Sequence, residues 1–354
     1  MQQQYDPRVE LRNRYQNCSN RISALDSRAE KMLTSFTALN SVYASASSGL
    51  ASVRGKGYIY KAALEGQVEV LKRDIDNFTA TSFTQAQNLR NSIRMDTQRL
   101  LGMGTGINAT INFGDINLAR TQLQQFESEI AGAEGRYGSA LSSMESSINN
   151  ITAQASQLQE VVNDIDTFLG RASTASFQLK PGENFVSAFE ATQIEGKEKT
   201  KGMLFFTNER LIFEKREEVV LEKKLFIATK KQLVKEVKFD YPIGYVKDIV
   251  KGRVGFLAWG GVYVNFKPPC PINQVVFDVK DVEIPQILEW SNYIISGDCE
   301  RDILAEAKAA IEEEKAKLKI ETKCPTCGAP IAREIVRGER SIRCEYCGTV
   351  IPVG

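Results

Sequence analysis

Apolar residues spaced three or four positions apart dominate the first half of the chain. In the first such stretch the steps of four and three alternate over about six heptads, which is the spacing of a coiled-coil seam. Asp6 and Pro7 suit the start of this helix, because Asp caps a first turn and Pro fits the first helical position. Arg54-Gly-Lys-Gly57 ends it. The seam consists of Leu11, Tyr15, Cys18, Ile22, Leu25, Ala29, Met32, Phe36, Leu39, Tyr43, Ala46, Leu50 and Val53.

Two further seams follow. The second runs from Leu64 through Gln85 to Leu100 and ends at the glycine cluster 102–106. We interpret this cluster as a flexible helix–helix loop rather than a phosphate-binding loop, because no strand precedes it and no Lys-Ser/Thr follows. The third seam runs from Ile116 through Ala140 to Leu169, with a stutter at the step from Met144 to Ile148. The three seams predict an antiparallel three-helix coiled-coil rod over residues 7–172, a spacer or oligomerisation element or, alternatively, a docking surface for a partner helix.

After a Ser/Thr-rich linker at 173–178, the pattern changes to short apolar runs typical of strands. Gly260-Gly261 is a two-residue hairpin signal between two of them. A helix is predicted from Ile284 to Ile295. The predicted strands are Phe185–Thr192, Met203–Thr207, Leu211–Glu214, Val219–Phe226, Val234–Asp240, Tyr245–Val250, Gly255–Trp259, Val262–Phe266 and Val275–Val279. The turn between the second and third of these contains Asn208, which tolerates left-handed backbone angles.

Three motifs in this region carry a family resemblance. They are the entry Pro181-Gly182-Glu183, a hairpin with Gly202, Leu204, Thr207, Asn208, Arg210, Leu211 and Phe213, and the helix with Trp290. Together they resemble the GRAM and bacterial pleckstrin-homology-like (PH-like) domains. The resemblance covers residues 179–297 and implies an all-β, partly open barrel with a C-terminal helix. It also implies that this domain binds membrane phospholipids or protein partners and performs no chemistry. The stretch Glu218–Glu236 is longer than the family usually has between these strands.

A cluster of lysines offers a candidate binding surface in this domain. Clustered lysines attract anionic membranes, at roughly 1 kcal/mol each near the surface. Lysines on an edge strand also block edge-to-edge aggregation, so a solvated strand edge is the alternative interpretation. The cluster consists of Lys223, Lys224, Lys230, Lys231, Lys235 and Lys238.

Two C-x-x-C pairs near the C-terminus form the strongest local motif. Cys324 and Cys327 are followed, after 16 intervening residues, by Cys344 and Cys347, and a Gly follows each pair. The pattern resembles a zinc ribbon over 321–354, with one structural Zn²⁺ held by four thiolates. Rubredoxin-like iron and a redox dithiol are the alternatives. The intervening segment is predicted to form a hairpin from Ile331–Val336 and Ser341–Arg343.

Composition limits the possible chemistry. The chain of 354 residues has 45 basic and 44 acidic residues, a net charge of +1, and no histidine. Ser-His-Asp and Cys-His catalysis and His-dependent zinc hydrolases are therefore excluded. Cys18, Cys270 and Cys299 have no metal-ligand spacing and are interpreted as structural. The absence of a signal-like N-terminus and of a long apolar run, together with the paired cysteine spacing, predicts a cytoplasmic protein.

The sequence thus predicts a multidomain, non-enzymatic protein. Its parts are the all-α rod (7–172), the PH-like barrel (179–297), a helical arm (298–320) and the zinc ribbon (321–354). The predicted function is that of an adaptor or scaffold whose barrel docks on membrane lipid or a protein, peripheral to the membrane in the first case, with homo-oligomers formed through the coiled coil. One alternative is a nucleic-acid- or transcription-associated ribbon protein that uses Arg333, Arg337, Arg340 and Arg343. A second is an enzyme with a carboxylate site drawn from Glu195, Glu198 and Asp240, although no spacing groups them.

Overall fold

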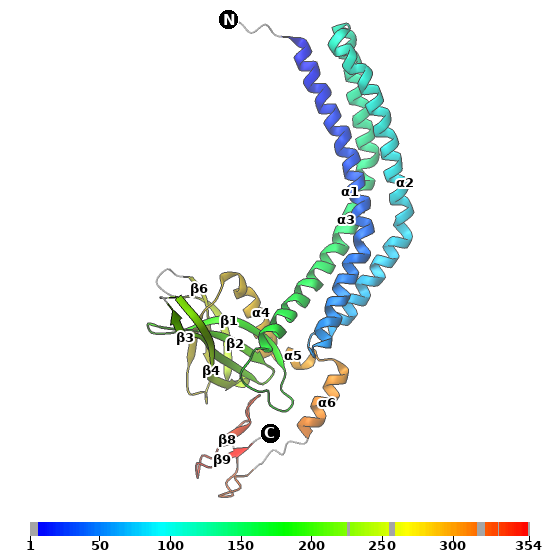
Figure 1. The fold of residues 1–354 in the computed structure, drawn as a ribbon. Helices are drawn as coiled ribbons and strands as arrows, with labels where there is room; N and C mark the ends of the chain where they lie inside the picture. The colour runs from blue at the N-terminus through cyan, green and yellow to red at the C-terminus, as the bar shows by residue number, and fades with distance from the viewer. Residues whose placement is uncertain (1–5, 225–226, 255–258, 317–322, 332, 353–354) are drawn as a thin grey trace. The chain divides into compact units, whose positions relative to one another are not determined.

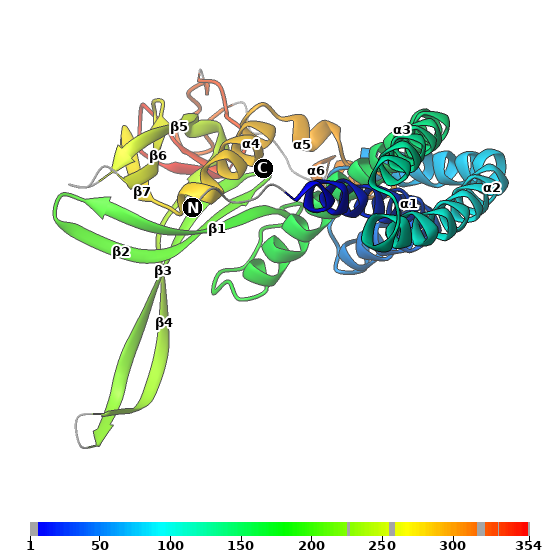
Figure 2. The ribbon, with the colours of Figure 1, turned by 90° about the horizontal axis from the view of Figure 1, so that it is seen from above.

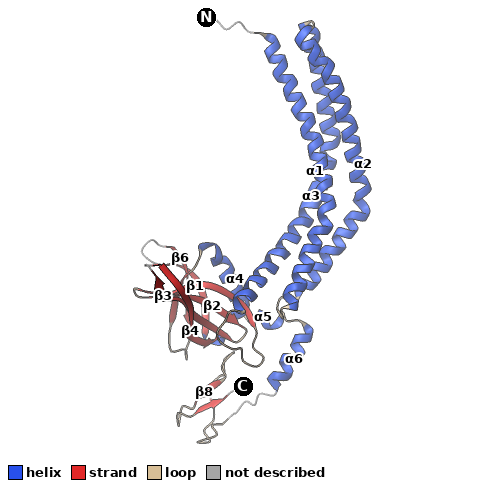
Figure 3. Ribbon diagram, viewed as in Figure 1, coloured by secondary structure: helices blue, strands red, loops and turns tan. Residues whose placement is uncertain are grey.

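The computed structural model describes residues 6–224, 227–254, 259–316, 323–331 and 333–352. Its elements are labelled in Figure 1, and Figure 3 separates the helical first half from the strand-rich second half. The chain divides into two compact units. One comprises Met1–Ser48 and Gly66–Glu160, and the other comprises Gly49–Glu65 and Val161–Gly354. We call the first the helical unit and the second the mixed unit.

Three long helices account for the first half of the chain: α1 (Pro7–Gly55), α2 (Ala63–Phe113) and α3 (Ile116–Ala172). Asp6 begins α1 as expected, because its Oδ1 accepts a hydrogen bond of 2.9 Å from the amide of Arg8. Asp115 does the same for α3, accepting from the amides of Asn117 and Leu118 at 2.9 Å. The prediction of three long helices is confirmed.

Ion pairs fix the register inside the helical unit. Arginines at heptad spacing on α1 meet glutamates on α3, in the pairs Arg14–Glu127, Arg21–Glu134 and Arg28–Glu145, all at 2.5–2.7 Å. Residue numbers rise together in these pairs, so α1 and α3 run parallel. Helix α2 runs antiparallel to α1, because Arg90 pairs with Glu30 while Thr97 lies against Asp26.

The seam of α3 departs from the predicted one around its stutter. Leu141 is buried and Ala140 only partly so, which makes the steps from Ala133 to Tyr137 and on to Leu141 the two consecutive fours. The stutter therefore lies about two turns earlier than predicted. In α2 the buried residue is likewise Ala86, next to the predicted Gln85.

The glycine cluster 102–106 is helical, so its interpretation as a loop is wrong. Gly104 is buried at a seam position of α2. A Cβ there would lie 3.2 Å from the ring of Phe126 and 3.3 Å from that of Tyr15. The missing side chain lets these two aromatic rings approach, with their centroids 6.4 Å apart.

The mixed unit is built on a seven-stranded antiparallel sheet of order β4-β3-β2-β1-β7-β6-β5. Two meanders, β1 to β4 and β5 to β7, are joined where Thr192–Ile194 of β1 pair with Val276–Asp278 of β7. In Figure 2, β3 and β4 extend beyond the rest of the sheet as a long hairpin. The strands are β1 (Phe185–Glu195), β2 (Glu198–Thr207), β3 (Arg210–Lys224), β4 (Ile227–Pro242), β5 (Val246–Val254), β6 (Trp259–Phe266) and β7 (Gln274–Asp278).

One face of this sheet forms the main core. Phe206, Phe213 and Phe277 are fully buried there, and the ring of Phe213 stands 5.1 Å from that of Phe277. Gly202 is required beside them, because a Cβ at this position would lie 2.8 Å from the Phe213 ring. Helix α4 (Ile284–Ile295), at the predicted position, buries Trp290 against the same unit.

The opposite face, which we call the outer face, is partly covered by the predicted linker. Phe177 packs on Phe185 and Phe205, with ring centroids 5.7 and 5.2 Å away. The side chain and amide of Ser176 both donate to Glu214 at 2.6 and 2.7 Å. Residues 173–178 are therefore packed against the sheet and do not form a free linker.

Two predicted turns lie elsewhere. Gly260 and Gly261 lie inside β6, where Gly261 pairs with Gly252 and Asp278, so they form no hairpin turn. Residues 255–258, which include most of the predicted strand Gly255–Trp259, lie outside the described residues. Gly196-Lys197 instead forms a two-residue hairpin turn between β1 and β2, and Gly196 has φ +60°.

The remaining segments also differ from prediction in detail. The arm is two helices, α5 (Asp298–Arg301) and α6 (Ala305–Ala316), and its predicted end at 317–320 lies outside the described residues. In the C-terminal module, residues 323–352, β8 (Ser341–Arg343) pairs with β9 (Val350–Pro352). The described residues of the predicted strand Ile331–Val336, 331 and 333–336, form no strand, and β8 pairs with β9 instead.

Candidate functional site

Four cysteines converge in the C-terminal module. Each C-x-x-C pair closes a tight turn in which the following Gly adopts φ +74° and donates its amide to the carbonyl of the first cysteine, at 2.9 Å. The four Sγ atoms lie within 4.8 Å of one another. The Cys324–Cys347 and Cys327–Cys344 distances are 3.6 and 3.7 Å. Four sulfurs about 2.3 Å from one tetrahedral ion would stand roughly 3.8 Å apart, so the cluster can hold one metal ion.

The C-terminal module is attached to the sheet by an interface of buried polar groups. Arg340 makes a bidentate ion pair with Glu209 in the β2–β3 turn, at 2.7 and 2.9 Å, and both side chains are largely buried. Gly338, with φ +84°, lies so close that a Cβ would stand 1.7 Å from the Glu209 carbonyl oxygen. The amide of Gly244 donates to the carbonyl of Arg337 at 3.0 Å.

Glu339 supports the same interface from inside the module. It is buried and accepts hydrogen bonds from Arg333 and, at 2.7 Å, from the hydroxyl of Tyr245. Burial, followed by this carboxylate, raises the pKa of Tyr245 to about 12. Arg337 donates to the carbonyl of Ile294 at the end of α4. Three of the four arginines proposed for nucleic acid are thus held by partners within the protein.

The Thr207–Arg210 turn is a buried network. Thr207 Oγ1 donates to Glu183 at 2.6 Å and accepts from the amides of Glu209 and Arg210. Arg210 makes a bidentate pair with Glu183 at 2.7 Å and also contacts Asp240. Burial alone would raise the pKa of Glu183, but these hydrogen bonds outweigh it and lower the pKa. In the motifs that carry the family resemblance, Glu183 and Arg210 therefore have a structural role as a buried ion pair.

Asn208 plays a different part from the one predicted. Its amide oxygen accepts from the backbone of Asn184 at 2.8 Å, and its amide nitrogen donates to Gly182. Among the described residues, Lys61 is the only non-glycine residue with a positive φ, so Asn208 has no left-handed conformation. The side chain, not the backbone preference, accounts for Asn at this turn.

The predicted lysines do not form one described surface. Lys223, Lys224, Lys230 and Lys231 belong to the extended β3–β4 hairpin, where Glu222 pairs with Lys230, but their side chains lie outside the described residues. Lys235 donates to the Thr174 carbonyl, and Lys238 pairs with Glu236 at 3.2 Å.

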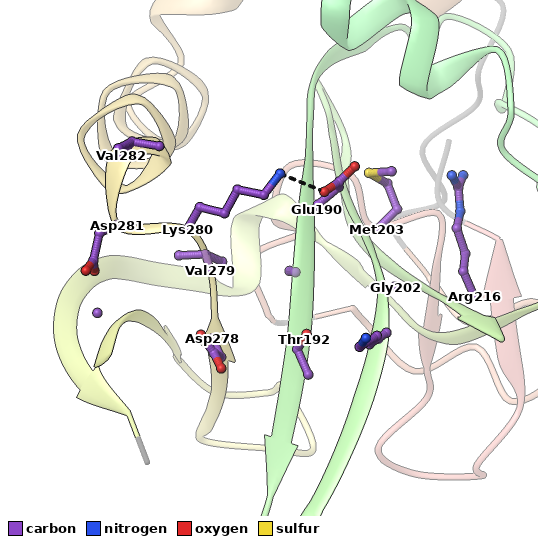
Figure 4. A pocket seen from close by; sticks show the side chains of 13 residues that line it. Glu190, Thr192, Gly202, Met203, Arg216, Asp278, Val279, Lys280, Asp281 and Val282 are labelled. Atoms are coloured by element: carbon purple, nitrogen blue, oxygen red, sulfur yellow. Dashed lines mark hydrogen bonds and ion pairs between the residues drawn. The ribbon is translucent and has the colours of Figure 1, made fainter. Parts of the chain in front are cut away.

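A hollow with a volume of about 810 Å³ lies on the outer face beside β1, β2 and β7. Figure 4 shows Lys280 reaching Glu190, at 3.0 Å, while Met203 and Arg216 come from β2 and β3. A second hollow of about 570 Å³ shares Lys201 and Arg216 with the first and adds Lys199 and Lys215. Neither hollow was predicted, because only strand register brings these residues together.

The carboxylates of the enzyme hypothesis are not brought together. Glu195 and Glu198 flank the β1–β2 turn, whereas Asp240 on β4 pairs with Ile212 and contacts Arg210. Of the single cysteines, Cys18 and Cys299 are buried and Cys270 is partly buried. Burial raises the pKa of Cys299 to about 11, which fits a structural thiol.

The sequence did not predict that the turn between α1 and α2 packs against the β-sheet domain. Tyr58 and Tyr60 are buried, and the Tyr58 hydroxyl donates to Val186 of β1 at 3.2 Å. The Lys61 ammonium lies 4.1 Å from the ring centre of Tyr293 and 4.9 Å from that of Trp290. The aromatic residues Tyr58 and Tyr60 inside a turn were the available signal. Large aromatic side chains are usually buried, so their presence indicates a turn that packs against another segment.

Comparisons with known proteins give no family. No protein-family model matches the sequence, and a search of curated proteins found no match. Among solved structures, the C-terminal domain of an unknown protein from Leishmania infantum is 19% identical, with a TM-score of 0.23 over 32% of this chain and 86% of that one. The Vps36 N-terminal PH domain is 15% identical, with a TM-score of 0.23 over 34% and 85%. The DH/PH domains of p115-RhoGEF are 10% identical, with a TM-score of 0.26 over 79% and 94%. At these scores the similarities carry no argument.

Proposed function

We propose that this chain is a non-enzymatic adaptor whose GRAM- or PH-like domain, residues 179–297, docks on an anionic membrane surface. The helical rod (7–172) serves as a spacer, and the arm (298–320) leads to a zinc ribbon (321–354) that is a structural part of the domain. The topology supports this assignment, because an antiparallel sheet followed by one helix agrees with the all-β domain and C-terminal helix that the resemblance implies. Among the described residues, no helix combines the length and apolar character needed to cross a membrane.

The observation that carries the proposal is the composition of the outer face beyond the segment 173–178. Lys199 and Lys201 are exposed there. They lie beside two hollows, with volumes of about 810 and 570 Å³. Exposed aliphatic side chains lie on the same unit, with Leu233 48% and Val282 84% exposed. Cations beside exposed aliphatic groups are the combination that binds the membrane interface.

The non-enzymatic part of the proposal rests on how the reactive groups are used. Glu183, Arg210 and Glu339 are buried in hydrogen-bonded pairs. The four clustered thiols would fill a tetrahedral ion, leaving no open position for a substrate. We therefore assign the cluster to one structural Zn²⁺, which a small module with little core of its own would need for folding.

The rod is proposed as a spacer because its seams are already used. Residues such as Ile22, Ile93 and Leu123 are buried within this one chain, which favours a spacer over an oligomerisation element. A nucleic-acid role of the ribbon loses support from the internal bonds of Arg333, Arg337 and Arg340. A protein partner in place of lipid remains an outcome of the test below.

The test is co-sedimentation of the full-length protein with vesicles of neutral phosphatidylcholine, with and without an anionic lipid, at low and moderate salt. We expect pelleting with anionic vesicles alone and a decrease as salt rises, because salt screens charge attraction. The absence of pelleting under all conditions would overturn membrane docking and leave the domain as a protein-binding module, to be pursued by pull-down with the same protein.

A further inference from the structure

Strand register places three basic residues side by side on the outer face. Arg216 of β3 pairs directly with Lys235 of β4. The register of β2 with β3, carried one residue beyond its last pair, sets Lys201 opposite Arg216. Lys201 and Arg216 also line both hollows. Neighbouring strands lie about 4.8 Å apart, so the three residues form a continuous row across three strands. We call Lys201, Arg216 and Lys235 the basic row.

Such a row costs stability unless it is compensated, because like charges directly opposite each other repel. Arg216 is partly compensated: its Nε donates to buried Glu214 at 2.8 Å, and Nη2 donates to the hydroxyl of Thr174 at 2.9 Å. Lys235 donates to a neutral carbonyl of Thr174. Lys201 is exposed, and Lys199, two residues before it, lies on the same face of β2.

The nearby acidic groups are placed to the sides. Glu190 is engaged by Lys280 at 3.0 Å. Asp278 lies beyond Thr192 at the far end of the row, and Glu218 lies beside the second hollow. The row itself therefore holds more positive than negative charge and lies next to open volume.

The aliphatic neighbours favour a membrane over a soluble ligand. Leu233 and Val237 flank Lys235 on the same face of β4, and they are 48% and 38% exposed. Val282, at the rim of the larger hollow, is 84% exposed. In Figure 4 it stands on the side of that hollow opposite to Arg216. Aliphatic groups on both sides of a cationic row can enter the interfacial layer while the cations contact headgroups.

We infer that the basic row binds the phosphate group of an anionic membrane lipid headgroup, in the hollows on the outer face of the sheet. Lys201 supplies an ammonium, and the Arg216 guanidinium, held in place by Glu214 and Thr174, supplies a planar donor for the phosphate oxygens. This inference rests on the proposed membrane docking and gives it a location different from the β3–β4 hairpin lysines.

The experiment uses the full-length protein and vesicles that contain a phosphatidylinositol monophosphate. The test variant is Lys199→Gln/Lys201→Gln, which leaves the bonds of Arg216 intact. The matched control is Lys247→Gln/Lys251→Gln, which removes the same charge from exposed positions of β5. A second comparison neutralises Lys223, Lys224, Lys230 and Lys231 to Gln. The soluble inositol monophosphate headgroup is added as a competitor, and circular dichroism confirms that each variant is folded.

We expect the affinity of the test variant to fall by roughly thirtyfold, about fivefold for each lost lysine, while the control binds nearly as well as the unmodified protein. The soluble headgroup should displace the unmodified protein. Equal loss in test and control, or loss in the hairpin variant alone, would overturn the basic row while membrane docking stands. Failure of the unmodified protein to bind any vesicle would overturn the proposed function itself.

Discussion

Arg340 in the C-terminal module and Glu209 in the β2–β3 turn form a bidentate ion pair across 131 residues of chain. The pair lies where Gly338 meets the Glu209 backbone, so charge and close packing coincide at one point. The Arg340→Ala substitution should lower the free energy of unfolding by about 2 to 5 kcal/mol, because it leaves a largely buried carboxylate unpaired. Urea denaturation measures this.

A charge exchange provides the control for this pair. The double variant Glu209→Arg/Arg340→Glu should recover part of the loss, since opposite charges again face each other. If the single and double variants are equally unstable, the contribution comes from packing and not from charge.

Metal removal should destabilise more than the C-terminal module. The two cysteine pairs flank the segment with Arg337, Gly338 and Arg340, which contacts the sheet. We therefore expect chelation, or Cys344→Ser, to lower the thermal midpoint of the mixed unit, and elemental analysis to find one zinc per chain. After chelation, Arg340→Ala should have little further effect. An unchanged effect of this substitution in the metal-free protein would show that the interface does not depend on the metal.

Glycines 102 and 104 should respond in opposite ways to substitution. Gly102→Ala should stabilise by up to about 1 kcal/mol, because nothing lies within 4 Å of its Cβ position and Ala favours the helix. Gly104→Leu should destabilise by about 1 to 3 kcal/mol, because Phe126 and Tyr15 occupy the space. Thermal denaturation of the two variants decides this. A tolerated leucine would mean that the rings can move apart.

Acid should weaken the protein through Glu183. Hydrogen bonds from Arg210, Lys180 and Thr207 lower the pKa of Glu183 below its usual 4.5 despite burial. A lowered folded-state pKa means that this stabilisation is complete above about pH 4.5 and is lost as pH falls through the folded-state pKa. Glu183→Gln should cost about 3 to 5 kcal/mol at pH 7 and less at pH 3. Urea denaturation at both pH values tests this. A loss that does not change with pH would contradict it.

The sequence allowed the elements with strong periodicity to be predicted and failed where tertiary contacts decide. The α4 bounds and the three long helices follow from apolar spacing and capping residues such as Asp6. The glycine cluster 102–106 looked like a loop because composition suggested flexibility, whereas its helical state depends on Phe126 and Tyr15 from two other helices.

The candidate sites divide in the same way. The convergence of the cysteines could be expected from C-x-x-C spacing, since each pair is a local turn. The contact of Arg340 with Glu209 and the alignment of Lys201 with Arg216 could not, because each depends on a register or an interface between distant segments. The lysines were grouped by sequence proximity, but residues on a strand alternate between faces, and Lys235 and Lys238 have different partners.

The Arg340–Glu209 pair also has a consequence for the order of events during synthesis. A chain elongated at about 5 to 20 residues per second makes Glu209 roughly 7 to 26 seconds before its partner. Lys61, at the α1–α2 turn, is made earlier still relative to its contacts Trp290 and Tyr293. The mixed unit is therefore completed only when the last part of the chain has been made. Until then, a growing chain exposes the unpaired Glu209 in the β2–β3 turn and the aromatic residues of the α1–α2 turn. Both are surfaces that a chaperone can bind.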